Sequence, residues 1–126
     1  MATAPGTTPK VLLVEDNAIL KFPMEEALAQ RGFGCLYAGT LDGAEEILRN
    51  EPVAAAILDV NIHGTAVFGL AREIRAKGTP CVFTTGYTDA AIPPEFADAP
   101  YFKKPVEFDE VVDAVAAGVK KAAAGA

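Results

Sequence analysis

The stretch Val53–Gly64, "VAAAILDVNIHG", runs six apolar residues directly into an aspartate, Asp59. An uninterrupted run of small and branched apolar residues is typical of a parallel strand that helices cover on both faces. The pattern therefore predicts a buried strand over 53–58 that delivers a carboxylate at its end. A carboxylate in that place needs a reason, because a buried charge is costly unless it has partners.

The composition predicts one compact, cytoplasmic domain. The 126 residues are 51% hydrophobic and 22% charged, which is typical of a chain that buries a single core. The net charge is −6 and the 11 lysines and arginines form no basic stripe, so a nucleic-acid surface is excluded. Cys35 and Cys81 lack metal-binding spacing and are expected to be free thiols in a reducing compartment. No signal peptide is recognisable and no apolar run approaches the roughly 18–20 residues that cross a bilayer, so no membrane partner is expected.

Strand-like and helix-like segments alternate along the chain. The expected strands cover residues 10–15, 33–38, 53–58, 79–84 and a short segment near Tyr101. Apolar residues at helical spacing fill the first three intervals and the stretch from residue 107 onward. The alternation predicts an α/β fold, a parallel sheet with helices on both faces. We expect the folded domain to span 10–121, with a disordered tail over 1–9 and a flexible one over 122–126.

Local signals mark where the expected helices begin and end. Asn17 and Thr40 are suited to cap the first two helices. Pro23 lies inside the first helix, so a kink or a late start is expected there. Gly78 is suited to close the third helix. The interval from 86 to 100 contains three prolines, which makes a regular helix of normal length improbable.

The residues that follow the strands have a common chemistry. Glu15 and Asp16 follow the first strand, Asp59 the third, Thr85 the fourth and Lys104 the fifth. In parallel α/β sheets the carboxyl ends of the strands form the site, which explains why Asp59 is carried there. Carboxylates brought together favour a hard divalent cation such as Mg²⁺. With a hydroxyl and an ammonium added, the set indicates a site for a phosphoryl group.

Four motifs in this order resemble one known family. "VLLVEDN", "ILDVNIHG", "FTTGY" and "YFKKPV" are similar to the motifs of the receiver domains of two-component response regulators, over roughly residues 10–120. The resemblance implies a flavodoxin-like or CheY-like three-layer sandwich with strand order 2-1-3-4-5. It also implies that Asp59 accepts a phosphoryl group from a sensor histidine kinase or a histidine phosphotransfer protein.

The resemblance assigns roles to the remaining site residues. It implies that Mg²⁺, which Mn²⁺ or Ca²⁺ can replace, is held by Glu15, Asp16, Asp59 and the backbone carbonyl of Asn61. Thr85 and Lys104 would bind the phosphoryl group, and Tyr101 would be the switch aromatic. Such a chain is a signalling switch and not an enzyme, with at most slow self-catalysed phosphorylation and dephosphorylation.

Two departures narrow the comparison within the family. "NIHG" stands where a Met-Pro dipeptide is usual, and Pro93-Pro94 falls where the fourth helix should lie. Together with "FTTGY", these features resemble the small stand-alone receivers nicknamed FAT GUY. With no output domain expected, the chain would act as a monomer on an unknown downstream protein.

Several alternatives remain open at this point. Asp59 also fits a solvated turn, Asp16 a helix cap, Tyr101 a core filler, and His63 a structural or solvated loop residue. Among functions, a pseudo-receiver that only binds proteins is the main rival. An aspartyl-phosphate hydrolase is disfavoured because such enzymes place a second aspartate where this chain has Asn61.

Overall fold

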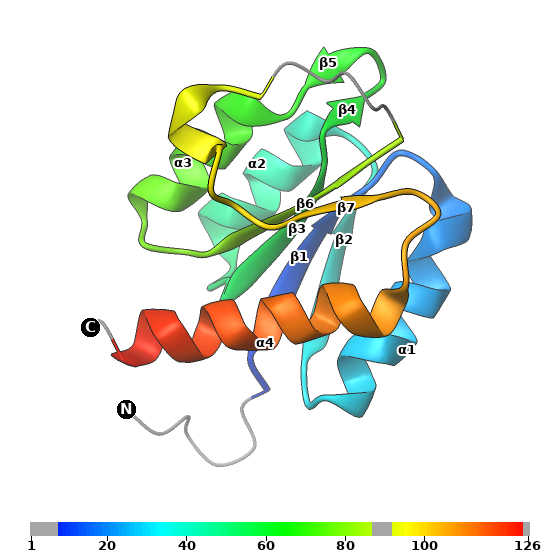
Figure 1. Ribbon diagram of the computed structural model, residues 1–126, viewed down its shortest axis with the longest axis vertical. Helices are drawn as coiled ribbons and strands as arrows, with labels where there is room; N and C mark the ends of the chain where they lie inside the picture. The colour runs from blue at the N-terminus through cyan, green and yellow to red at the C-terminus, as the bar shows by residue number, and fades with distance from the viewer. Residues whose placement is uncertain (1–7, 87–91, 125–126) are drawn as a thin grey trace.

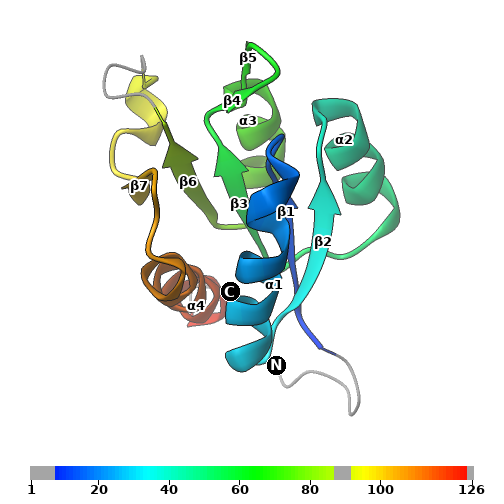
Figure 2. The ribbon, with the colours of Figure 1, turned by 90° about the vertical axis from the view of Figure 1, so that its right-hand side faces the viewer.

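A computed structural model describes residues 8–86 and 92–124. Its main sheet has five parallel strands in the order β2-β1-β3-β6-β7, which confirms the predicted fold. The strands are β1 (Lys10–Val14), β2 (Gly34–Ala38), β3 (Ala55–Asp59), β6 (Cys81–Thr85) and β7 (Tyr101–Lys103). The helices are α1 (Lys21–Gln30), α2 (Leu41–Asn50), α3 (Phe68–Ala76) and α4 (Phe108–Ala124). Figures 1 and 2 show α1 and α4 on one face of the sheet and α2 and α3 on the other.

The cap expected from Thr40 and the late start of the first helix are confirmed, whereas Asn17 caps a 3₁₀ helix that precedes α1. The Asn17 side chain accepts a hydrogen bond from the Ile19 N–H and caps a short 3₁₀ helix, η1 (Ala18–Leu20). The α-helix itself begins at Lys21, so Pro23 falls in its first turn, where the missing N–H costs nothing. Thr40 caps α2 by accepting from the Gly43 N–H at 3.0 Å.

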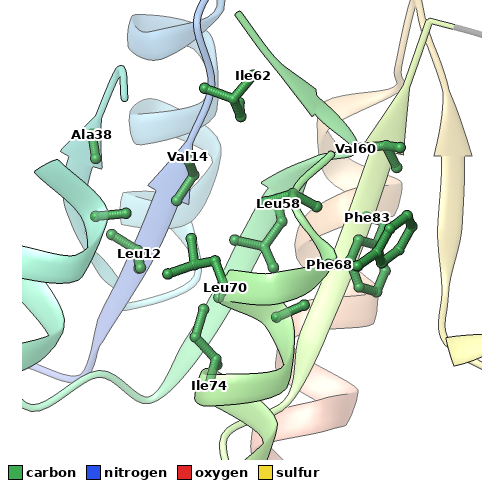
Figure 3. Close-up of a cluster of buried hydrophobic side chains, with 14 of the residues drawn as sticks. Leu12, Val14, Ala38, Leu58, Val60, Ile62, Phe68, Leu70, Ile74 and Phe83 are labelled. Carbon is green, nitrogen blue, oxygen red and sulfur yellow. The ribbon is translucent and has the colours of Figure 1, made fainter. Parts of the chain in front are cut away.

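Each face of the sheet has its own hydrophobic core. Because strand side chains alternate, Leu12, Leu58 and Phe83 lie on the α2–α3 face (Figure 3), whereas their neighbours Leu13, Ile57 and Val82 lie on the α1–α4 face. The apolar positions predicted for the last helix supply the second core: Val111, Val112 and Val115 are fully buried. All strands except the edge ones are therefore covered on both sides, as their apolar runs predicted.

The segment between β6 and β7 contains no α-helix in its described part, 92–100, as the prolines predicted. A single 3₁₀ turn, η2 (Pro94–Phe96), takes the place of a fourth helix there. Phe96 is fully buried, and Arg72 forms an ion pair with Glu95 on the same turn. Arg75 donates to the Glu95 carbonyl and lies 4.5 Å from the centre of the Phe96 ring. Two arginines of α3 thus hold this turn against the core.

A hairpin after β3 is not among the predicted elements. Two-residue strands, β4 (Asn61–Ile62) and β5 (Thr65–Ala66), form an antiparallel pair that Figure 1 shows above the main sheet. Their turn consists of His63 and Gly64, both with positive φ, +50° and +85°. The "NIHG" departure is therefore a tight turn that places His63 at a fixed position.

The predicted boundaries shift at a few places. β3 includes Asp59 and begins at Ala55, and β6 runs from Cys81 to Thr85, so both strands lie one or two residues further along than expected. Within the tail expected over 122–126, α4 continues through Ala124, and the predicted flexibility of this tail stays a prediction. Residues 1–7 and 125–126, which belong to the two expected tails, lie outside the described residues.

The expectation that the cysteines are unpaired agrees with the structure. Cys35 and Cys81 are both free thiols, on opposite faces of the sheet. Among the helices of the described ranges, none is both long and apolar enough to span a membrane.

Candidate functional site

Three carboxylates meet where β1 and β3 end side by side. The two strands are in register up to Val14 and Leu58, so the residues that follow are brought together. Carboxylate oxygens of Glu15, Asp16 and Asp59 lie within 4.8 Å of one another. Glu15 and Asp59 are buried, with 3% and 5% of their surface exposed, whereas Asp16 is half-buried. Three acids this close, two of them buried, need a compensating cation.

Lys104 supplies one positive charge to this cluster. It follows β7, and its backbone N–H donates to the Thr85 carbonyl at 2.8 Å, which fixes the start of its side chain. Its Nζ lies 2.8 Å from Asp59 Oδ2 and 2.8 Å from Glu15 Oε1. The lysine predicted at this position therefore bridges the two buried carboxylates.

Burial and charge act in opposite directions on these groups. Burial raises the pKa of Glu15, and the negative charge of Asp59 adds to this, while the bonds from Lys104 and the Asn17 N–H partly offset it. Burial on its own would lower the pKa of Lys104, but its bonds to Asp59 and Glu15 outweigh burial and raise it. Lys104 is thus held in the charged form, and the cluster keeps more negative charge than one lysine can balance.

Glu15 is held from two further sides. Its carboxylate accepts a hydrogen bond from the Asn17 N–H at 3.0 Å. The backbone N–H of Glu15 donates to the Ala38 carbonyl, and the backbone carbonyl of Glu15 accepts a hydrogen bond from the Tyr37 hydroxyl at 2.6 Å. Tyr37 is a site neighbour that sequence reasoning missed. The sequence carries no signal for this contact, because a strand tyrosine is ordinary and its acceptor is backbone.

Asn61 and Asp16 both contact the hairpin region. The Asn61 N–H donates to Asp59 Oδ1 at 3.2 Å, and its side-chain oxygen accepts from the Gly64 N–H at 2.8 Å. The Asn61 side chain therefore shapes the turn, and the metal role of its carbonyl stays a prediction. Asp16 accepts a hydrogen bond from the His63 N–H at 2.9 Å. His63, expected from the sequence to be a structural or solvated loop residue, therefore lies next to the site.

Thr85 and Tyr101 belong to the other face of the sheet. Thr84 is buried and in register with Asp59, so by alternation Thr85 shares the α2–α3 face with Phe83. Tyr101 stacks on Phe83 with ring centres 4.9 Å apart, and its buried hydroxyl has no hydrogen-bond partner among the described residues. The core role left open for Tyr101 is therefore present, while the switch roles of Tyr101 and Thr85 stay predictions.

The donor set suits a hard divalent cation. The three side chains offer only carboxylate oxygens, the ligands that Mg²⁺ and Ca²⁺ prefer. The cluster carries excess negative charge, and because the Asp16 side chain is partly exposed, an ion from solvent can reach it. These residues fit a bound divalent cation, and they leave its identity open.

The fold and this site define a class of protein, and comparison with known families agrees. Residues 11–116 match the family described as the response regulator receiver domain, so the chain belongs to that family. Receiver domains generally bind Mg²⁺, interact with histidine kinases or phosphotransfer proteins, and act as signalling switches.

Individual relatives differ in how much of this chain they share. SdrG from Sphingomonas melonis is 31% identical, with a TM-score of 0.76 over 89% of this chain and 97% of SdrG. A CheY-like receiver domain from Methanospirillum hungatei gives a TM-score of 0.82 over 95% of this chain and all of its own, at 19% identity. The transcriptional regulators TorR of Escherichia coli (26% identity, 81% of this chain) and TctD of Salmonella typhimurium (35%, 55% of this chain) match over 46% and 31% of their own length. The chain spans less than half of these curated relatives.

Proposed function

We propose that this chain is a stand-alone response regulator that accepts a phosphoryl group on Asp59. The donor would be a phosphohistidine of a sensor kinase or phosphotransfer protein, and the output a contact with a downstream protein. The observation that carries the proposal is the surroundings of Asp59. Lys104 Nζ lies 2.8 Å from its carboxylate, and the carboxylates of Glu15 and Asp16 lie close to it. The FTTGY motif and the single 3₁₀ turn between β6 and β7 support placement in the FAT GUY-like subgroup.

The reaction follows from the contacts of Asp59. An Asp59 oxygen attacks phosphorus, the phosphorus–nitrogen bond breaks, and the imidazole leaves with the bonding electron pair. Each Asp59 oxygen has a donor at rest, Lys104 on Oδ2 and the Asn61 N–H on Oδ1. Lys104 therefore transfers its hydrogen bond from the carboxylate to a phosphoryl oxygen as the new bond forms. Lys104 is thus placed to stabilise the negative charge that develops on the phosphoryl oxygens in the transition state, which is the usual source of electrostatic catalysis.

The other site residues complete the charge balance. Glu15, Asp16, Asp59 and the Asn61 carbonyl would hold Mg²⁺, or Mn²⁺ or Ca²⁺ in its place. When bound, this ion neutralises phosphoryl oxygens that the single charge of Lys104 cannot balance. The Thr85 hydroxyl would donate to the attached phosphoryl group, drawing the end of β6 toward the site.

The output would follow from added charge. A phosphoryl group brings roughly −1.5 to −2 charges to a mouth that already holds three carboxylates. Thr85 and Tyr101 lie on the face that carries η2, so a shift of Thr85 would be felt by the residues that follow β6. The downstream target would recognise this face of the monomer in the cytoplasm.

A phosphorylation assay with a small donor tests the proposal directly. The protein is incubated with acetyl phosphate or phosphoramidate, with and without Mg²⁺, and its intact mass is measured. We expect a gain of one phosphoryl group that requires Mg²⁺ and is lost in Asp59→Asn. A gain that persists in Asp59→Asn, or that needs no metal, contradicts the assignment. A chain that gains no mass from any donor would instead be a pseudo-receiver.

A further inference from the structure

The turn of the β4–β5 hairpin has an unusual residue in its first position. Ile62 and Thr65 are paired, so His63 and Gly64 alone close the hairpin, both with positive φ. This is the pattern of a type I′ turn, which strongly prefers Asn-Gly. His63 is the one non-glycine residue with positive φ in the described part of the chain. A histidine in this strained position calls for a compensating interaction.

His63 contacts two other loops at the same edge of the sheet. Its N–H donates to Asp16 Oδ2 at 2.9 Å, in the loop that follows β1. Its ring Nε2 lies 3.1 Å from the Gly39 carbonyl, in the loop that follows β2. One residue thus ties together the loops that follow three neighbouring strands, β2, β1 and β3.

We propose that His63 is a positioning residue for Asp16. This role rests on the proposed function, because Asp16 is one of the residues assigned to the divalent cation. Glu15 and Asp59 are buried and both contact Lys104, whereas the side chain of Asp16 is 28% exposed. Within the part of the chain that the structure describes, the Asp16 carboxylate accepts one hydrogen bond, the one from His63. The orientation of the outermost acid therefore depends on where the turn places this N–H.

The imidazole ring fixes the turn in that place. The hairpin has only two residue pairs, and such a short ribbon has little stability of its own. Because a carbonyl can only accept, Nε2 must carry the proton in the bond to Gly39. The ring thus anchors the turn to the loop after β2, and the anchored N–H leaves Asp16 Oδ1 available for a cation. Outer contacts of this kind commonly change metal affinity when they are removed.

His63→Asn separates the anchor from the turn. Asparagine followed by glycine is the preferred pair for this turn, so the substitution keeps the hairpin and the N–H while removing the ring. Mg²⁺ affinity is measured by calorimetry, together with urea unfolding in EDTA. We expect the affinity for Mg²⁺ to fall about tenfold, with the free energy of unfolding unchanged or raised. Thr65→Ala, an exposed change in the same hairpin, is the matched control and should bind Mg²⁺ like the parent.

A second measurement needs no variant. The chain has a single histidine, so ¹⁵N labelling of histidine gives one pair of ring signals. We expect the proton of the neutral ring on Nε2, as the contact with Gly39 requires. A proton on Nδ1, or an Mg²⁺ affinity of His63→Asn within twofold of the parent, overturns the positioning role alone. Failure of the parent to bind Mg²⁺ rejects the proposed function and the positioning role with it.

Discussion

The two faces of the sheet carry different kinds of structure. On the α1–α4 face, Glu15, Thr84 and Lys104 lie around a small cavity above the aliphatic side chains of Leu13 and Ile57. On the α2–α3 face, four rings pack together with centres 4.9–5.6 Å apart: Phe68, Phe83, Phe96 and Tyr101. Ion pairs therefore stabilise the strand ends on the α1–α4 face, and contacts between aromatic rings stabilise the α2–α3 face.

The difference suggests how chemistry and readout are kept apart. Thr84 and Thr85 are consecutive, yet alternation puts Thr84 on the face of Asp59 and Thr85 on the face of the rings. A single strand end therefore links the proposed acceptor with the proposed output surface. With the exception of Thr85, we expect substitutions on the ring face to change stability and those on the charged face to change chemistry.

The largest effect is expected from Phe96→Ala. Phe96 is fully buried and is the main contact of η2 with the core, so its removal leaves a cavity and should cost about 3–5 kcal/mol of unfolding free energy. Phe22→Ala is the matched control, because Phe22 is 73% exposed and its loss should cost within about 0.5 kcal/mol. Urea unfolding measures both. Equal losses in the two variants would show that η2 does not anchor this segment.

Lys104→Met should lower the rate of phosphorylation and raise the affinity for Mg²⁺. Loss of the ammonium removes the group that follows the developing charge, so the rate with phosphoramidate should fall roughly 10²–10³-fold. Mg²⁺ affinity should rise, because the competing cation at Glu15 and Asp59 is gone. Lys103→Met, an exposed neighbour, is the control. A similar rate loss in both variants would remove Lys104 from its proposed role.

The parts of the molecule that the sequence predicted are those with a strong period or a fixed topological place. Apolar runs identified the strands, and parallel topology then brought Glu15, Asp59 and Lys104 together at one edge. The β4–β5 hairpin is not predictable in this way, because strands of two residues are too short to show a periodic pattern. The hydrogen bond from the Tyr37 hydroxyl is not predictable for a different reason, because its acceptor is a backbone carbonyl that no residue pattern identifies.

The end of α4 illustrates a competition between two sequence signals. The small residues after Lys121 favour a fraying tail, whereas the helix continues to Ala124 in the structure. Alanine is the best helix former, so a run of three costs little to extend once Val115 and its neighbours have docked the helix. Packing of the earlier turns decided the boundary.

Two tyrosines on opposite faces predict effects of opposite sign. Tyr101→Phe removes a buried hydroxyl that has no partner among the described residues, so it should stabilise the protein by about 1 kcal/mol. Tyr37→Phe removes a hydroxyl that donates to the Glu15 carbonyl, so it should destabilise by about 1 kcal/mol. Thermal and urea unfolding measure the difference. Destabilisation by Tyr101→Phe would mean that its hydroxyl has a partner in the native protein.

The smallest difference between two variants is expected for the two thiols, one on each face. Burial raises the pKa of Cys35 from 9.0 to about 12, helped by the charge of Glu25, and raises that of Cys81 to about 11. A raised native pKa means that the unfolded chain loses its proton first, so each thiol lowers stability as pH rises above 9 and stops doing so near its native pKa. Cys35→Ala should therefore flatten the loss of unfolding free energy up to about pH 12, and Cys81→Ala only up to about pH 11. Urea unfolding at pH 8, 10 and 11 compares them, with pH 8 as the point where neither thiol contributes. A larger flattening from Cys81→Ala than from Cys35→Ala would contradict this order of the two pKa values.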